Sequence, residues 1–159
     1  MKSILAHCAE ARSERLEPGT VLLAEGQRTD RLYVLIEGQF DVSRGDVYIA
    51  SIKEPGSVFG EMSLFMDGPH AVTVTARSAV QLHVFDDAHN FFRSNTEVAF
   101  LIARLLAQRL NAATSYLVDL NQQFAGQDTH LAMVGEVLQS LICQQYEEFM
   151  LGSDRDPGA

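Results

Sequence analysis

The chain contains no tryptophan, four prolines and only two cysteines. Cys8 and Cys143 lie far apart, and neither has a second cysteine or a histidine at the spacing that zinc and iron–sulfur sites require. Two distant cysteines also do not form the set of disulfides that stabilises small secreted proteins. We therefore predict two reduced thiols and no metal-ligating residues.

Basic residues are too few for a typical nucleic-acid-binding surface. Asp and Glu number 21 against 12 Lys and Arg, which gives a formal net charge of -9. Because affinity for a phosphate backbone depends on cationic contacts, we expect no direct contact with DNA and no DNA-binding domain. No apolar run approaches the roughly 20 residues of a membrane helix. Residues 1–10 lack the pattern of a secretory signal, so we expect a cytoplasmic protein.

Between residues 20 and 85 the chain consists of short β-rich runs separated by turn residues. The runs are 21–23, 31–36, 39–42, 47–52, 58–59, 71–76 and 80–85. In residues 72–75 apolar and polar side chains alternate, as a strand with one buried face requires. Because no helical pattern connects the runs, they predict a mainly β jelly roll or barrel rather than a parallel sheet.

Helical patterns flank the β-rich region. Ile4, Leu5, Cys8 and Ala9 predict an N-terminal helix over residues 1–15. Asp86 or Asp87 caps a short helix that ends near 94–95, and Thr96 begins a helix of about seven turns. The expected domains are the helix 1–15, a β-roll with its long helix over 16–125, an extra helix over 126–151 and a flexible tail over 152–159.

The residues that most clearly indicate a ligand-binding site are 59–65 and 67–74. Gly60 permits a close backbone approach or a dihedral that a side chain would obstruct. Residues 61–64 predict one helical turn, whose first N–H groups can bind an anion. The Glu61 carboxylate beside this turn can accept hydrogen bonds from a ligand hydroxyl.

These motifs resemble the cyclic-nucleotide-binding domain family, with its catabolite-activator-protein-like β-roll. The resemblance spans about residues 16–117 and rests on ordered motifs at 18–20, 25–26, 32–38, 55–56, 59–64, 73–76 and 105–110. It implies a jelly roll (double-stranded β-helix) with an N-terminal helix and C-terminal helices.

The resemblance also implies a binding site for cAMP or cGMP as a regulatory ligand. The pair Gly60-Glu61 would start the phosphate-binding cassette, with Glu61 accepting the ribose 2′-hydroxyl. The amides of Met62 and Ser63 would face ribose and phosphate. On the long helix, Arg109 would reach Glu61 unless it is simply a solvated arginine, and Thr114 or Ser115 would contact the base.

One departure from the family pattern concerns the phosphate. Where the family has an arginine followed by Ser or Thr, this chain has His70 and Ala71. Arginine offers a permanent charge and a planar fork, whereas histidine with a pKa near 6.5 is largely neutral at pH 7. Losing one charge-assisted hydrogen bond costs about 1.5–3 kcal/mol, or one to two decades of affinity. We therefore expect near-millimolar rather than micromolar binding.

His70 then has three interpretations: a pH-dependent phosphate contact, a group that serves a different ligand, or a bystander in a pocket that has lost its ligand. The last two are favoured together. They predict a non-enzymatic regulatory module with a degenerate cassette, which acts through protein–protein contacts. The alternative is a cAMP or cGMP receptor that uses His70 in place of the arginine.

A remote alternative is a cupin-like metal enzyme, because cupins share the jelly roll. Such enzymes need clustered His and Glu ligands, whereas the predicted strands carry only His70 and His83. No catalytic residue is predicted. For partners, we expect a homodimer formed through the C-terminal helices and an unidentified protein; the last helix folding back on the β-roll is the alternative.

Overall fold

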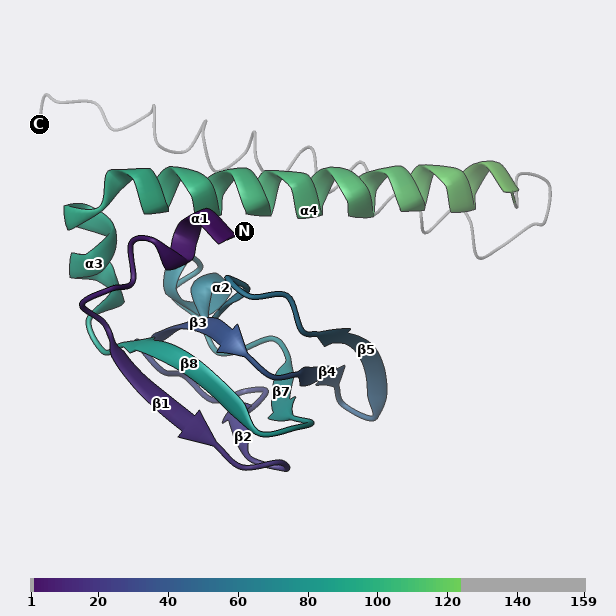
Figure 1. Cartoon of the computed structure of the whole chain (residues 1–159). Helices are drawn as coiled ribbons and strands as arrows, with labels where there is room; N and C mark the ends of the chain where they lie inside the picture. The colour runs from purple at the N-terminus through teal and green to yellow at the C-terminus, as the bar shows by residue number, and fades with distance from the viewer. Residues whose placement is uncertain (1, 124–159) are drawn as a thin grey trace, which may run out of the picture. The chain divides into compact units, whose positions relative to one another are not determined.

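The structure is a computed structural model that describes residues 2–123 (Figure 1). The chain divides into two units, residues 1–102 and residues 103–159, and each is described by itself. The first unit carries the helices α1 (Lys2–Leu5), α2 (Glu61–Phe65) and α3 (Ala88–Ser94). The long helix α4 (Thr96–Gln123) begins in the first unit and continues into the second.

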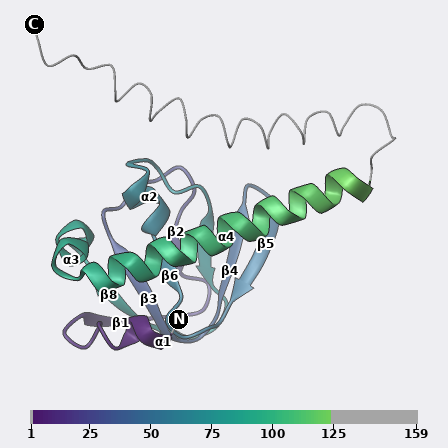
Figure 2. The same cartoon turned by 90° about the horizontal axis from the view of Figure 1, so that it is seen from above.

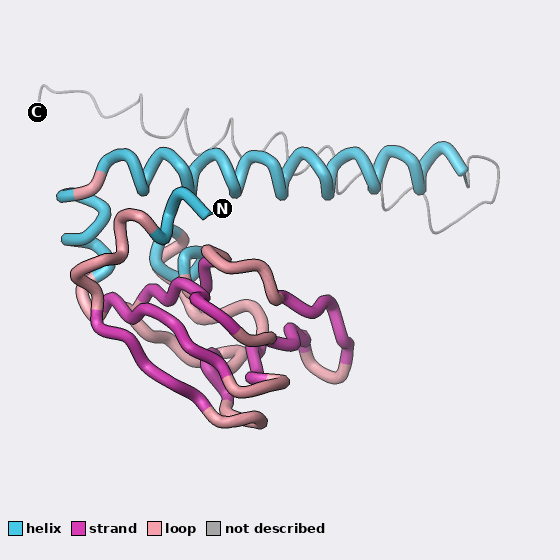
Figure 3. Tube along the Cα trace, viewed as in Figure 1, coloured by secondary structure: helices cyan, strands magenta, loops and turns pink. Residues whose placement is uncertain are grey.

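Eight strands between residues 12 and 85 form two antiparallel sheets of four strands each (Figure 3). The first sheet has the order β1-β8-β3-β6, and the second has the order β2-β7-β4-β5. In the turned view of Figure 2, β1, β3 and β8 lie to the left and β4 and β5 to the right. The strands are β1 (Arg12–Leu16), β2 (Val21–Leu23), β3 (Leu32–Glu37), β4 (Phe40–Arg44), β5 (Val47–Ile52), β6 (Val58–Phe59), β7 (Thr73–Ala76) and β8 (Val80–Phe85).

The main core lies between the two sheets, where alternating side chains of both sheets meet. Phe40 from the second sheet packs its ring edge-on against Phe59 from the first, with centroids 4.9 Å apart. The buried cluster comprises Leu23, Tyr33, Leu35, Phe40, Val42, Phe59, Val74, Ala76, Val80, Leu82 and Val84. Burial of this apolar surface is the main favourable term in folding the roll.

The strand β3 is buried on both faces. Tyr33 and Leu35 belong to the cluster between the sheets, while Leu32 and Val34, which alternate with them, are fully buried on the opposite face. Further buried apolar residues outside the main cluster come from the helices and from the turn after α1: Ile4, Cys8, Leu64, Ala88, Phe92, Val98 and Ile102. The unit therefore has a second apolar layer beside the core of the roll.

The expected antiparallel roll is confirmed, and the seven predicted strands all form. Four of them, β2, β5, β6 and β8, have the predicted bounds, and the others differ at their ends by one or two residues. The expected cap of α3 also forms, because the Asp87 carboxylate accepts the N–H of Asn90 at 3.0 Å. The predicted long helix begins at Thr96 as expected.

The N-terminal helix predicted over residues 1–15 is wrong in its extent. The helix α1 ends at Leu5, and Arg12–Leu16 is the strand β1, which pairs antiparallel with β8 along its whole length. Ile4 and Cys8 are buried, but only Ile4 lies in the helix, which ends after about one turn. Pairing with the edge of β8 satisfies the backbone of the next segment instead. The proposed boundary at 15/16 therefore falls inside a strand.

The predicted extra helix over 126–151 and the tail over 152–159 lie outside the described residues. Within residues 2–123, no helix combines the length and the apolar character that crossing a membrane requires.

The core predicts a clear contrast between two aromatic residues of the second sheet. Phe40→Ala should lower the free energy of unfolding by about 3–5 kcal/mol, because a fully buried ring is lost and a cavity remains. Tyr48→Ala is the matched control, since Tyr48 on the neighbouring strand is 57% exposed, and it should cost less than about 1 kcal/mol. Urea unfolding of both variants measures the difference, and equal losses would contradict this description of the core.

Candidate functional site

The candidate cassette covers residues 58–73 and runs from β6 through α2 to the start of β7. Gly60 joins β6 to α2 with a φ of +91°, in the region that favours glycine. A Cβ atom at this position would lie 2.5 Å from the carbonyl oxygen of Arg31, the residue that precedes β3. Only glycine permits this approach. The geometry therefore supports the prediction that Gly60 allows a close backbone approach that a side chain would obstruct.

The predicted helical turn forms as α2. Glu61 and Ser63 are each only 4% exposed, whereas Met62 and Phe65 on the other side of the turn are 46% and 51% exposed. The Ser63 hydroxyl donates a hydrogen bond to the Gly60 carbonyl at 3.1 Å, which ties α2 to the preceding turn. The helix therefore holds a carboxylate inside the unit, directly after a backbone turn that leaves no room for a side chain.

His70 is buried, with 4% of its surface exposed, and it is bonded to the loop between β2 and β3, residues 24–31 (the β2–β3 loop). Its Nε2 lies 3.0 Å from the Thr29 hydroxyl oxygen. Its backbone N–H donates to the Gln27 carbonyl at 2.8 Å, and its carbonyl accepts the Gly26 N–H at 2.9 Å. Burial lowers the pKa of His70 below its ordinary value, so the ring is mainly neutral at pH 7.

The same loop also binds the cassette on either side of His70. Arg28 donates to the carbonyl oxygen of Asp67 at 3.1 Å and pairs with the carboxylate of that residue. Arg28 also lies 3.6 Å from a carboxylate oxygen of Asp30. The backbone N–H of Glu25 donates to the Thr73 hydroxyl at 3.1 Å. The second half of the cassette is thus bonded to the β2–β3 loop at several points.

The structure brings six of the predicted site residues into one segment: Gly60, Glu61, Met62, Ser63, His70 and Ala71. Ala71 is exposed and supplies no hydroxyl. The other three lie on α4 in the second unit, where Arg109 and Ser115 are exposed and Thr114 is half-buried. Their expected contacts with the cassette remain predictions.

The contacts of the β2–β3 loop with the cassette were not predicted from the sequence, although its residues 25–26 belong to the family motifs. Gln27, Arg28 and Thr29 form a polar run between two strands, as many surface turns do. Nothing in that run indicates that its partners are His70 and Asp67, about 40 residues later in the chain. Among residues 2–123, no three His, Cys, Asp or Glu side chains gather as a metal ion would require.

Comparison with known proteins identifies the same region. The family model described as the cyclic nucleotide-binding domain matches residues 13–93. The CRP-like cAMP-activated global transcriptional regulator of Mycobacterium tuberculosis is 32% identical over 122 residues, which cover 69% of this chain and 54% of the regulator. The chain thus spans about half the length of this relative.

Two solved structures extend the comparison. The N-terminal domain of a transcriptional regulator from Streptomyces coelicolor is 31% identical, has a TM-score of 0.53, and is matched over 71% of this chain and 86% of that one. The catabolite activator protein of Thermus thermophilus is 21% identical with a TM-score of 0.65, over 92% of this chain and 84% of that one. The match to the catabolite activator protein shows that the two chains have a similar fold.

The turn at Gly60 is testable by comparison with a second glycine. Gly19 has a similar φ of +88° but open space around its α-carbon, so Gly19→Ala should cost about 1–2 kcal/mol for the dihedral alone. Gly60→Ala should cost about 3 kcal/mol or more, because the backbone must also move away from the Arg31 carbonyl. Unfolding in urea measures both losses. If the two variants lost equal stability, the close approach would not constrain the cassette.

Proposed function

The chain belongs to the cyclic nucleotide-binding domain family, and we propose that it is a non-enzymatic regulatory module whose phosphate-binding cassette is degenerate. The proposal rests mainly on one observation: the residue at the position of the phosphate arginine is a buried histidine bonded to Thr29. A neutral ring engaged with the protein lacks the permanent charge that the cyclic phosphate would need.

The cassette keeps the parts that shape a ligand site. Gly60 forms its turn, and Glu61 is held as a buried carboxylate at the start of α2. These parts suit a ribose hydroxyl and the edge of a phosphate. We therefore propose that affinity for cAMP and cGMP is reduced rather than that the pocket is absent.

The nearby arginine does not replace the missing charge in this proposal. The guanidinium of Arg28 is paired with Asp67 and Asp30, so two carboxylates offset its charge. To bind a phosphate, Arg28 would have to exchange these partners for the ligand. A competing internal partner weakens such a contact.

We further propose that the module acts through proteins, as a homodimer with an unidentified partner. On α4, Ala103, Leu106, Leu110, Ala113, Leu117 and Leu120 follow one another at alternating spacings of 3 and 4. This is the spacing of the a and d positions in a coiled coil. Leu110 is 47% exposed, and Ala103 and Ala113 are exposed as well. A second copy of the same helix is the occupant that this repeat favours.

We also propose a cytoplasmic location. Burial raises the pKa of the Cys8 thiol to about 11, so the thiol stays protonated at neutral pH. A protonated, buried thiol suits a reducing compartment.

Restoring the arginine should restore affinity. The unmodified chain should bind cAMP and cGMP with a Kd of about 1 mM, and His70→Arg should tighten binding about tenfold or more. His89→Arg adds the same charge at an exposed position of α3 and is the matched control, with no expected gain. Titration calorimetry measures all three proteins. Micromolar affinity of the unmodified chain would contradict a degenerate cassette.

The pH dependence separates this proposal from a receptor that uses His70 as its cation. Because burial lowers the pKa of His70, the charged ring forms only at pH values below its ordinary pKa near 6.5. A receptor of that kind would therefore bind more tightly at pH 6 than at pH 8. We expect similar weak binding at both, since the ring stays bonded to Thr29. A clear gain at pH 6, lost in His70→Gln, would favour the receptor.

The dimer has its own test. Leu110→Glu places a charge in the repeat and should convert the dimer to a monomer at tens of micromolar, as sedimentation velocity would measure. Gln108→Glu introduces the same residue on the opposite side of α4 and should leave the dimer intact. A monomeric unmodified chain, or equal behaviour of the two variants, would rule out this interface.

A further inference from the structure

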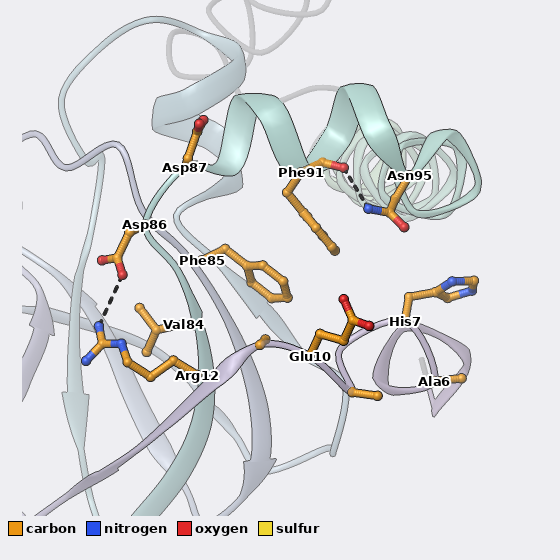
Figure 4. A pocket seen from close by; sticks show the side chains of 12 residues that line it. Ala6, His7, Glu10, Arg12, Val84, Phe85, Asp86, Asp87, Phe91 and Asn95 are labelled. Atoms are coloured by element: carbon orange, nitrogen blue, oxygen red, sulfur yellow. Dashed lines mark hydrogen bonds and ion pairs between the residues drawn. The ribbon is translucent and has the colours of Figure 1, made fainter.

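A pocket of about 620 Å³ lies on the first unit, outside the cassette (Figure 4). Three parts of the chain form it: residues 6–12 after α1, residues 84–87 at the end of β8, and Phe91 with Asn95 at α3. None of its lining residues belongs to the cassette, residues 58–73. The pocket is therefore separate from the candidate cassette.

Two phenylalanine rings line one side of this pocket. Phe85 and Phe91 are stacked with their centroids 4.0 Å apart and their planes 29° apart. Both side chains are only half-buried, so part of their aromatic surface faces the pocket. Aromatic surface of this kind attracts flat apolar groups and also cations, through the negative face of the ring.

The charge that remains available in the pocket is negative. Arg12 is paired with Glu14 and Asp86, each at 3.4 Å, and Asp86 also contacts Arg31 at 2.9 Å. The carboxylate of Glu10, by contrast, has no hydrogen bond or ion pair within the described part of the chain. In Figure 4 it points into the space beside the Phe85 and Phe91 rings.

We propose that this pocket binds a small organic cation, a primary amine attached to an aromatic or apolar body. The ammonium group donates a charge-assisted hydrogen bond to Glu10, and the apolar body covers Phe85 and Phe91. Anions of the same shape are disfavoured, because Glu10, Asp86 and Asp87 all line the pocket. This ligand class differs from the anionic cyclic nucleotides, so the proposal does not depend on the cassette.

Naphthylmethylamine and naphthoate share one aromatic body and carry opposite charges, so they are the probes. The full chain is titrated with each by calorimetry and by amide chemical shifts. We expect saturable amine binding with a Kd of about 1 mM, and naphthoate at least about tenfold weaker. Shifts should concentrate at the lining residues. Amine binding that fails to saturate by about 10 mM, or equal binding of the two probes, would overturn the proposal.

Two variants test the site against non-specific binding. Glu10→Gln should weaken the amine about tenfold, whereas Glu37→Gln, a matched exposed change on β3, should have no effect. Ala6→Trp fills the pocket from an exposed lining position and should abolish binding. Both pocket positions are exposed, so the variants should unfold at the temperature of the unmodified chain. Unchanged amine affinity in Glu10→Gln or in Ala6→Trp would overturn the assignment.

Discussion

The burial of β3 on both faces determines where the neighbouring strands and the start of the cassette lie. Leu32 and Val34 face one apolar layer, and Tyr33 and Leu35 face the other. The strand also pairs with β8 along one edge and with β6 along the other. Because β6 leads directly to Gly60, which lies against the backbone just before β3, the cassette begins at a position that the core determines.

The chemistry of the cassette follows from where its polar groups find partners. His70, Asp67 and Thr73 bond to the β2–β3 loop, so the segment is ordered by the protein itself. A ligand that needs these groups must compete with bonds already formed, and it gains no permanent charge at position 70. The proposed weak recognition of a cyclic phosphate rests on these contacts, which also stabilise the segment.

A row of aromatic rings joins the two candidate sites. Phe65 on α2 stacks on Phe92 with centroids 5.1 Å apart, and Phe92 lies beside Phe91, with centroids 5.9 Å apart. Phe91 in turn stacks on Phe85 at the pocket. A continuous series of packed aromatic rings on α3 therefore connects α2 to the pocket. Closely packed contacts of this kind are stiff.

Local periodicity and turn residues were enough to predict the mainly β fold, the bounds of four of the eight strands, the glycine turn before Glu61 and the long helix from Thr96. The strand formed by residues 12–16, by contrast, depends on tertiary contacts, since the edge of β8 supplies its backbone partners. The environment of His70 depends on tertiary contacts as well. Burial lowers the pKa of the His70 ring, and Nε2 lies 3.0 Å from the Thr29 hydroxyl oxygen. No local pattern specifies a contact between residues so far apart in the chain.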